Sequence, residues 1–299
     1  MSLRARMLNT WLRRFERPML ARMPAQPASK MRARFETQAR MFFAPPRSTR
    51  VMLTTVAGLP ALDIGPEGAP PILYLHGGAY VFGSPRTHAG LLGRLVARCD
   101  ARAVLPDYPL APEHPFPAAP EAVLAAYRDL AAQGPVILSG DSAGGGLALA
   151  LLALICREGL PQPLMTFALS PWTDLTLLGD SMTANADTDV LLPPRRIAEA
   201  RDIYLDGADP TDPRASPLFA DFKGATPVHI WAGETEILRD DARRMAERLR
   251  GQGVAVTLTR EQDLPHVWPI FPAWQLPESA TTLDQVAQAV QTSLDRASR

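Results

Sequence analysis

The stretch GDSAGGG at residues 140–146 lies between a short apolar run, PVIL, and a long stretch of Ala and Leu. This order predicts a buried strand, a tight glycine turn and a helix. Such a turn can present a serine hydroxyl as a nucleophile, or it can cradle a phosphate with backbone N–H groups. The stretch has no GxxxxGK[ST] pattern and no lysine, which disfavours the phosphate site. The role of Ser142 therefore depends on the rest of the chain.

The strand-then-helix order repeats along the chain. Apolar runs typical of strands occur at 72–75, 103–106, 136–140, 164–170, 228–233 and 254–260, and helical patterns at 87–98, 120–132, 143–157, 240–250 and 282–296. A hairpin is expected before them, at 51–56 and 60–64. Continuous apolar strands separated by helices predict an α/β fold, with a mostly parallel sheet and helices on both faces. In such sheets ligands bind beyond the carboxyl ends of the strands.

The first 50 residues differ in charge from the remainder. They hold twelve Lys and Arg residues against two acidic ones, so they carry about +10 and the rest of this neutral chain about −10. Basic segments of this kind occur in proteins that bind membranes or nucleic acids and in transit peptides. Apolar residues recur near one helical face of the segment, at Met7, Trp11, Leu12, Phe15 and Met19. We favour a helical segment docked on an acidic body.

The composition excludes several classes of protein. With 46% apolar and 21% charged residues, the 299-residue chain can bury a substantial core and is not disordered. No stretch reaches the roughly 20 apolar residues of a membrane span, and arginines interrupt the N-terminus where a secretory signal needs an apolar run. Cys99 and Cys156 have no CxxC or His neighbour, so no metal site is expected. We expect a cytoplasmic protein without a membrane span.

Ser142 lies where a nucleophile is needed. Gly140 and Gly144 allow a tight turn, and the start of the following helix offers partial positive charge to a developing oxyanion. A serine hydroxyl attacks only when a base takes its proton, and a third group must orient that base. In folds with such a turn, the order along the chain is nucleophile, acid, histidine.

Of the five histidines, His266 is the candidate base. It lies in the loop LPHVWP after the last expected strand, at the edge of the sheet where ligands bind, and it follows Ser142 in sequence. His76 ends the first buried strand, and we expect it to organise a turn without transferring protons. His229 lies inside an apolar strand and is typical of a packed histidine.

The orienting acid is expected in GETEILRDD, between the strand at 228–233 and His266. Asp240 and Asp241 begin a helix, where acids are favoured for structural reasons. Glu234 and Glu236 lie in the loop itself, where a carboxylate can reach an imidazole. The spacing alone leaves both glutamates open.

The stretch HGGAY at 76–80 is a candidate oxyanion loop. A tetrahedral intermediate needs backbone N–H donors directed at its oxyanion, and glycines let the backbone approach that closely. The N–H of Ala143, next to Ser142, is a second expected donor.

With these pieces in this order, the chain resembles the hormone-sensitive-lipase-like family of α/β-hydrolase esterases. Four stretches carry the resemblance: HGGAY at 76–80, DYPLAPEHPFPAA at 107–119, GDSAGGGLA at 140–148, and GETEILRDD with LPHVW at the end. Together they are far more specific than a GxSxG pattern alone. The resemblance implies an α/β-hydrolase fold.

The resemblance also assigns roles to residues. It implies that Ser142 is the nucleophile, His266 the base and Glu236 the orienting acid. It implies an oxyanion hole made by three N–H groups, those of Gly77, Gly78 and Ala143. Most members have Asp in a motif of the type DPLxD, whereas EILRD places a glutamate here; triads of this fold use either acid.

Family members carry a helical cap made from the N-terminal segment and an insertion. Residues 1–48 and 175–205 match these two segments in position and leave 49–299 as the catalytic domain. Glu113 and His114 are expected to brace the oxyanion strand.

The expected function is that of a carboxylic-ester hydrolase that cleaves short- to medium-chain acyl esters through an acyl-enzyme intermediate. The expected partner is a small ester, without a cofactor, a metal or nucleic acid, and the resemblance leaves a homodimer open. The alternatives are an amidase or acyltransferase with the same triad, a non-catalytic ligand-binding protein, and a protein that binds anionic surfaces through its basic arm.

Overall fold

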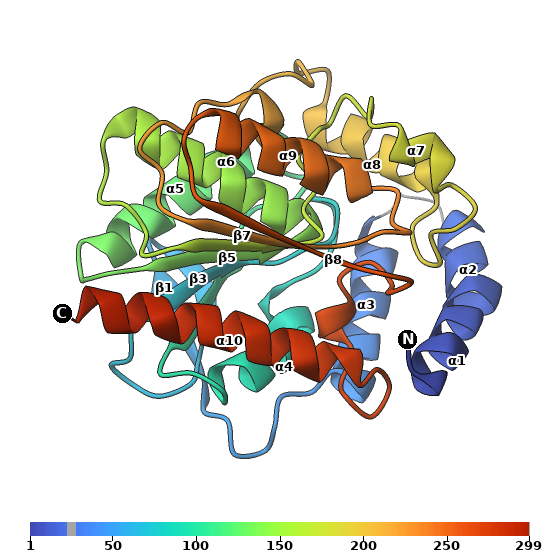
Figure 1. Cartoon of the computed structure of the whole chain (residues 1–299), viewed down its shortest axis with the longest axis horizontal. Coiled ribbons are helices and arrows are strands. Elements are labelled where there is room, and N and C mark those ends of the chain that lie inside the picture. Colours follow the sequence, from blue (N-terminus) through green and yellow to red (C-terminus); the bar gives the residue numbers. More distant parts are fainter. Residues whose placement is uncertain (23–27, 299) are drawn as a thin grey trace.

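A twisted sheet forms the centre of the computed structural model, which describes residues 1–22 and 28–298 (Figure 1). In these residues the sheet has eight strands in the order β1-β2-β4-β3-β5-β6-β7-β8. The strands are β1 Val51–Val56, β2 Leu59–Ile64, β3 Pro71–Leu75, β4 Arg102–Pro106, β5 Ile137–Asp141, β6 Thr166–Leu169, β7 Val228–Gly233 and β8 Val256–Glu261. β2 pairs antiparallel with β1 and β4, and all other neighbours are parallel. The predicted mostly parallel sheet is confirmed.

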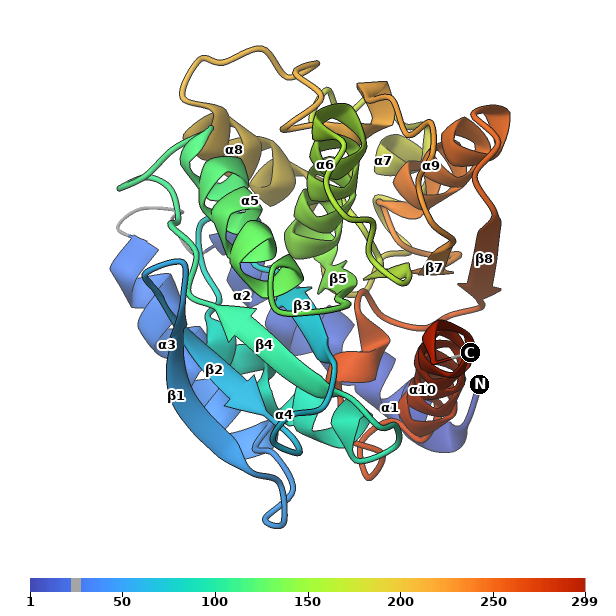
Figure 2. The same cartoon turned by 90° about the vertical axis from the view of Figure 1, so that its left-hand side faces the viewer.

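Helices cover both faces of this sheet (Figures 1 and 2). One face packs against α4 Pro85–Val96 and α10 Glu278–Ala297, and the other against α5 Ala118–Ala131, α6 Ser142–Glu158 and α9 Arg239–Gly251. Alternation along β3 shows why: Ile72 and Tyr74 belong to the core under α4 and α10, whereas Leu73 and Leu75 belong to the core under α5, α6 and α9. Successive side chains of a strand point to opposite faces, so a strand buried on both faces needs an unbroken apolar run.

The two predicted cap segments are helical and contact each other. They contain α1 Leu3–Trp11, a π-helical turn Leu12–Glu16, α2 Arg17–Arg22, α3 Ala28–Phe42, α7 Ser181–Ala184 and α8 Pro194–Leu205. Arg13 donates to the carbonyl of Thr188 at 3.1 Å, and Arg196 donates to that of Ala21 at 2.8 Å. Two 3₁₀ turns, Pro217–Phe219 and Trp268–Ile270, complete the described helices. In the described part of the chain no helix is long and apolar enough to span a bilayer.

The apolar face predicted for the N-terminal segment is divided between the core and the surface. Leu12 is buried against the body of the protein, whereas Met7, Trp11 and Phe15 are exposed. The segment is docked through polar contacts as well, because Asn9 donates to the carbonyl of Asp263 at 2.7 Å. The segment is therefore docked as expected through one side, and its other side is exposed.

Close backbone packing explains the glycines of GDSAGGG. A Cβ on Gly144 would lie 2.0 Å from the carbonyl oxygen of Leu75, at the end of β3. A Cβ on Gly146 would lie 1.9 Å from the carbonyl oxygen of Trp172, in the loop after β6. Real contacts of this kind do not fall below about 3 Å, so α6 can start directly against two loops only because these positions lack side chains.

We expect Gly146→Ala to destabilise the protein by about 1–3 kcal/mol, because the added methyl must push α6 away from the Trp172 carbonyl. Guanidinium unfolding followed by circular dichroism measures this change. Gly251→Ala in α9 is the matched control, since a Cβ there meets nothing within 4 Å. Equal unfolding midpoints for the two variants would contradict the packing argument.

Candidate active site

The turn between β5 and α6 places Ser142 at the carboxyl edge of the sheet. Asp141 is extended, with φ at −126°, and Ser142 begins the helix at a φ of +52°. A left-handed conformation is strained for a residue with a side chain and is found mainly where the surrounding structure enforces it. Here the carbonyl of Ser142 accepts a hydrogen bond from the N–H of Trp172 at 2.9 Å. The turn presents the serine side chain half-exposed at the strand end.

The structure brings the three side chains of the predicted triad together. His266 Nε2 lies 2.8 Å from Ser142 Oγ, and His266 Nδ1 lies 2.6 Å from Glu236 Oε2. The imidazole and the glutamate are both buried. A serine, histidine and carboxylate in this sequence of contacts can move the serine proton to the ring and stabilise the charge that forms there.

Further hydrogen bonds hold the Glu236 carboxylate in place. Its Oε1 accepts from the Ser170 hydroxyl at 2.7 Å and from the Gly233 N–H at 2.6 Å, so Oε2 is left to face His266. Ser170 Oγ also accepts from the N–H of Val267 at 3.1 Å. One hydroxyl thus connects the loop of the acid to the loop of the histidine. Sequence reasoning missed Ser170, although a serine at the carboxyl end of an apolar strand was a signal.

Two opposing effects set the pKa of His266. Burial disfavours the charged ring and lowers its pKa, whereas the Glu236 carboxylate raises it by charge and by hydrogen bonding. Asp189 and Asp141 add to the second effect, and the net result is a pKa above the usual 6.5. The ring therefore gains proton affinity from the carboxylate that orients it.

The other candidate acids have different partners. Glu234 forms an ion pair with Arg260 at 3.0 Å. Asp240 and Asp241 begin α9, and their carboxylates accept hydrogen bonds from backbone N–H groups in the loop at 173–181. Burial raises the pKa of Asp241 to about 7. The structural role predicted for this aspartate pair fits these contacts.

The oxyanion loop requires a correction at Gly77. The N–H of Gly77 donates to Asp141 Oδ1 at 3.0 Å, so it is directed at a buried carboxylate. The next residues, Gly78 and Ala79, have positive φ values of 124° and 53°, and they line the cavity beside Ser142. Within residues 1–22 and 28–298, neither of their N–H groups has a protein acceptor. The sequence could not show that a neighbouring carboxylate would take the first N–H of the loop.

A buried charge pair lies under this loop. Asp141 accepts from the Tyr74 hydroxyl at 2.8 Å, and one of its oxygens lies 3.2 Å from His88 Nε2. Burial, the largest single effect, raises the pKa of Asp141 and lowers that of His88. For each group the charge of the partner and the hydrogen bonds around it, those from Tyr74 and the Gly77 N–H among them, together outweigh burial. The net pKa of the carboxyl is therefore lowered and that of the imidazole raised. No role in the site was predicted for His88 from the sequence.

His76 has the structural role expected of it. Burial lowers its pKa to about 3, so the ring is neutral, and Nδ1 lies 2.8 Å from the Gly77 carbonyl. The ring stacks on Tyr108, whose hydroxyl donates to the His76 carbonyl at 2.6 Å. These contacts fix the start of the oxyanion loop.

Of the bracing roles expected of Glu113 and His114, that of Glu113 is indirect, through Arg32, and the described residues show none for His114. Glu113 binds Arg32 of α3 at 2.6 Å, and Arg32 also donates to the carbonyl of Val81 at 2.9 Å. His114 is exposed. The PEHPFP loop therefore connects to the oxyanion segment through an arginine of the N-terminal segment, a link that local sequence could not show.

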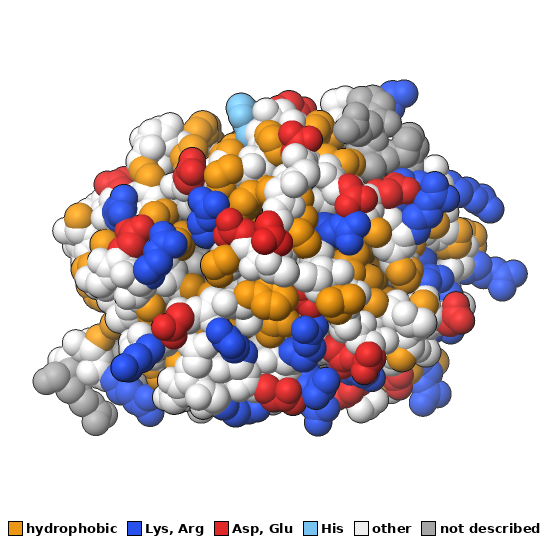
Figure 3. Space-filling view, turned by 90° about the horizontal axis from the view of Figure 1, so that it is seen from above, with side chains coloured by type: hydrophobic (Ala, Val, Ile, Leu, Met, Phe, Trp, Pro, Cys, Tyr) orange, Lys and Arg blue, Asp and Glu red, His pale blue; other side chains and the backbone are white. Residues whose placement is uncertain are grey.

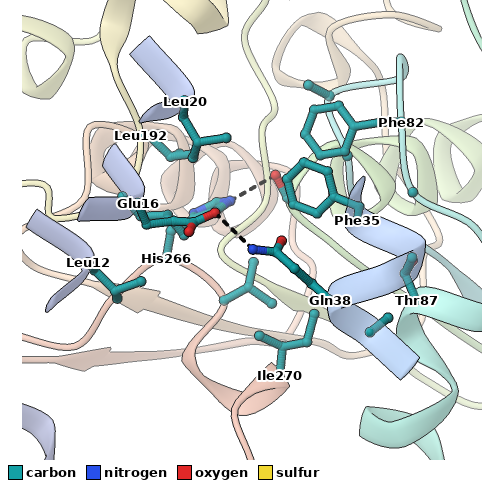
Figure 4. Close-up of a pocket in the computed structure, with 18 of the residues that line it drawn as sticks. Leu12, Glu16, Leu20, Phe35, Gln38, Phe82, Thr87, Leu192, His266 and Ile270 are labelled. Atoms are coloured by element: carbon teal, nitrogen blue, oxygen red, sulfur yellow. Dashed lines mark hydrogen bonds between the residues drawn. The ribbon is translucent and has the colours of Figure 1, made fainter. Parts of the chain in front are cut away.

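A cavity of about 700 Å³ opens beside Ser142 and His266 (Figure 4). Most of its lining is apolar and comes from α1, α2, α3, α8 and the turn after His266. Figure 4 shows one polar pair in this lining, Glu16 and Gln38, with the amide nitrogen 3.5 Å from the carboxylate. In the described part of the chain no group of three His, Cys, Asp or Glu side chains could hold a metal ion.

Comparison with known proteins identifies the relatives of this chain. A family profile described as alpha/beta hydrolase fold matches residues 72–270. The chain is 40% identical over 209 residues to an acetyl-hydrolase of Streptomyces hygroscopicus, covering 67% of this chain and 70% of that protein. It is 38% identical over 229 residues to an esterase of Acinetobacter venetianus, covering 75% of each. A solved esterase from the bacterial hormone-sensitive lipase family matches with a TM-score of 0.90 and 36% identity, covering 98% of this chain and 99% of that one.

The mostly parallel sheet with a serine at its strand-to-helix turn defines an α/β hydrolase. The chain belongs to that family and, within it, to the hormone-sensitive-lipase-like esterases. It is an enzyme of the carboxylesterase type.

The buried Asp141–His88 pair makes a pH-dependent contribution to stability. The raised pKa of His88 means that its share is fully present below pH of about 6.5 and is lost as the pH rises through the folded value. The lowered pKa of Asp141 means that its share is present above pH of about 4 and is lost as the pH falls.

We therefore expect His88→Gln to cost about 3 kcal/mol near pH 6, since it leaves a buried charge without its partner, and to cost less near pH 10. Chemical unfolding at the two pH values measures the difference. His114→Gln, at an exposed histidine, should show no such dependence. A cost for His88→Gln that is the same at both pH values would contradict the charge pair.

Proposed function

We propose that this carboxylesterase-type enzyme hydrolyses small carboxylic esters through Ser142, His266 and Glu236. The observation that carries the proposal is the pair of contacts at His266, 2.8 Å to the serine oxygen and 2.6 Å to the glutamate, at the wall of an apolar cavity. The names of the relatives, esterase and acetyl-hydrolase, support an ester as the substrate.

In the first half of the reaction, His266 Nε2 takes the proton of Ser142 as Oγ attacks the ester carbonyl carbon. The carbonyl oxygen becomes an oxyanion, and the Glu236 carboxylate stabilises the imidazolium. When the tetrahedral intermediate collapses, the bond to the alcohol oxygen breaks, and His266 donates its proton to that oxygen. The alcohol leaves and the acyl group stays on Ser142.

In the second half, a water molecule takes the place of the alcohol. His266 accepts a proton from the water as its oxygen attacks the acyl carbon, and then returns a proton to Ser142 as the acid leaves. Apart from the ester and the water, these steps need only the nucleophile Ser142, the base His266 and the carboxylate of Glu236.

For the oxyanion we propose the N–H groups of Gly78, Ala79 and Ala143. Gly78 and Ala143 were expected from sequence, and Ala79 replaces Gly77 because the Gly77 N–H is bound to Asp141. Ala143 is the second residue of α6, where an N–H has no partner inside the helix. A donor in such a position stabilises a transition-state oxyanion by on the order of 3 kcal/mol.

We further propose that residues 1–48 and 175–205 act as a cap that sets the acyl preference. The parts of these segments in the described chain line the cavity with apolar side chains, among them Leu12, Phe15, Phe35 and Ile197. A lining of this kind favours short- to medium-chain acyl groups over polar ones, since each buried CH₂ contributes about 0.8 kcal/mol.

We expect Ser142→Ala to lower kcat on p-nitrophenyl butyrate by roughly 10⁴-fold or more, because the nucleophile is removed. Glu236→Gln should lower kcat by roughly 10³-fold or more, since the ring loses both its orientation and its counter-charge. Steady-state hydrolysis measures both changes.

The matched control is Glu234→Gln, two residues away, whose carboxylate pairs with Arg260 and not with His266. It should retain most activity. Full activity in Ser142→Ala would overturn the mechanism, and a crippled Glu234→Gln beside an active Glu236→Gln would reverse the choice of acid. Turnover of matched amides, and of esters with added alcohol acceptors, separates a hydrolase of esters from an amidase or acyltransferase.

The pH profile supplies an independent test of the Glu236 contact. His266 must be neutral to act as base, so kcat/KM should rise with pH through the raised pKa of the ring, with a midpoint above 6.5. In Glu236→Gln the carboxylate that raises this pKa is gone, and burial remains. The acid limb of the residual activity should therefore shift to lower pH, whereas that of Glu234→Gln should stay in place. An unshifted limb in Glu236→Gln would contradict the assignment.

A further inference from the structure

The N-terminal helix exposes a continuous apolar stripe. Leu3, Met7, Trp11 and Phe15 are 73%, 65%, 47% and 58% exposed. Residues four apart lie above one another on a helix, so these four side chains form one row along α1 and the π-helical turn. Single exposed apolar residues are ordinary on a protein surface, but an ordered row of large ones marks a binding surface.

The stripe leads to the mouth of the cavity. Trp11 and Phe15 are exposed and also belong to the cavity lining. Phe42 of α3 has the same double position at 45% exposure. On the inner side of the same helix, Leu12 and Glu16 are buried and line the cavity. A single helix therefore presents one side to the cavity and the neighbouring side to the surroundings.

Arginines accompany the stripe on the outer side of the helix. In α1 and the π-helical turn, Arg4, Arg6 and Arg14 are exposed, whereas Arg13, also exposed, donates to the Thr188 carbonyl of the other cap segment. The only acidic residue among residues 1–22 is Glu16, which is turned inward and buried. In Figure 3 several Lys and Arg side chains project at the right-hand end of the molecule, where Figure 1 places α2, and others are spread over the rest of that face. The outer face thus combines large apolar side chains with arginines that form no ion pair within the part of the chain that the structure describes.

We propose that the outer face of α1 binds an anionic lipid surface. An amphipathic helix that presents Trp, Phe and Leu together with arginines lies in the plane of such a surface, with the apolar side chains among the acyl chains and the guanidinium groups at the phosphates. This orientation places the mouth of the cavity against the lipid.

Charge distinguishes this occupant from a second copy of the chain. A symmetric dimer through the stripe would bring the arginines of one helix close to those of the other, and like charges at an interface oppose association. A lipid phosphate surface complements the same arginines. The proposal concerns binding alone, so its outcome does not depend on the proposed ester hydrolysis.

Co-sedimentation of the 299-residue chain with phosphatidylcholine vesicles, with and without phosphatidylglycerol, tests the proposal. We expect binding to the anionic vesicles, weakened by salt. Leu3→Ser/Met7→Ser should weaken binding about tenfold or more, since two large side chains no longer insert. Arg6→Gln/Arg14→Gln should weaken it about 25-fold, since each arginine near an anionic leaflet contributes roughly fivefold.

The matched control is Met52→Ser/Leu53→Ser on β1, a pair with comparable exposure of 50% and 76%. It should bind vesicles as the wild type does. Leu3 and Met7 are exposed and lie outside the cavity lining, so the circular dichroism spectrum and the unfolding midpoint of their variant should match those of the wild type, which shows that it is folded.

Three results would overturn the proposal: no binding of the wild type to anionic vesicles, equal loss in the β1 control, or full binding by both α1 variants. A wild-type dimer in analytical ultracentrifugation that becomes a monomer in Leu3→Ser/Met7→Ser would assign the stripe to a second copy instead. Vesicle binding with no hydrolysis of any ester would contradict the proposed function and leave this inference standing.

Discussion

The site depends on the left-handed conformation of Ser142 at the end of β5. A serine in this conformation is held only if the surrounding structure fixes it. Here α6 lies against the Leu75 and Trp172 carbonyls so closely that a Cβ on Gly144 or Gly146 would collide with them. The glycines at 144 and 146 therefore do more than bend the chain. They let the loops after the neighbouring strands β3, β5 and β6 pack closely together around Ser142.

Two buried carboxylate–histidine pairs flank that hydroxyl, and their hydrogen bonds separate their roles. Both ring nitrogens of His88 face protein atoms, Asp141 on one side and the Thr87 hydroxyl at 2.9 Å on the other. His266 has Glu236 on one side and Ser142 on the other. Only the second pair can pass a proton to a reacting group. The first pair holds the Gly77 N–H and so shapes the oxyanion loop.

Sequence patterns were sufficient for the sheet, its helices and the order of the site residues, because strand ends in a parallel sheet gather along one edge. They were insufficient where a long-range contact decides between neighbours. Spacing left Glu234 and Glu236 open, and the resemblance to a family favoured the latter; only the fold shows which carboxylate meets the imidazole. The Gly77 N–H and the Ser170 hydroxyl are similar cases, since each is assigned by a partner from another loop.

The N-terminal helix connects the chemistry to the surroundings of the protein. In an apolar cavity, Glu16 is held by Arg34 at 3.3 Å and by Gln38, so the helix is fixed from the inside by a polar contact that lipid or substrate chains cannot replace. Its outer side carries no such restraint and exposes apolar residues instead. If α1 binds lipid as proposed, an ester dissolved there would meet Trp11 and Phe15, which are exposed and also line the cavity beside Ser142. The acyl chain of such an ester would pass from one apolar environment to another without exposure to water. The free energy that it loses on leaving the lipid would then be offset by its burial in the cavity.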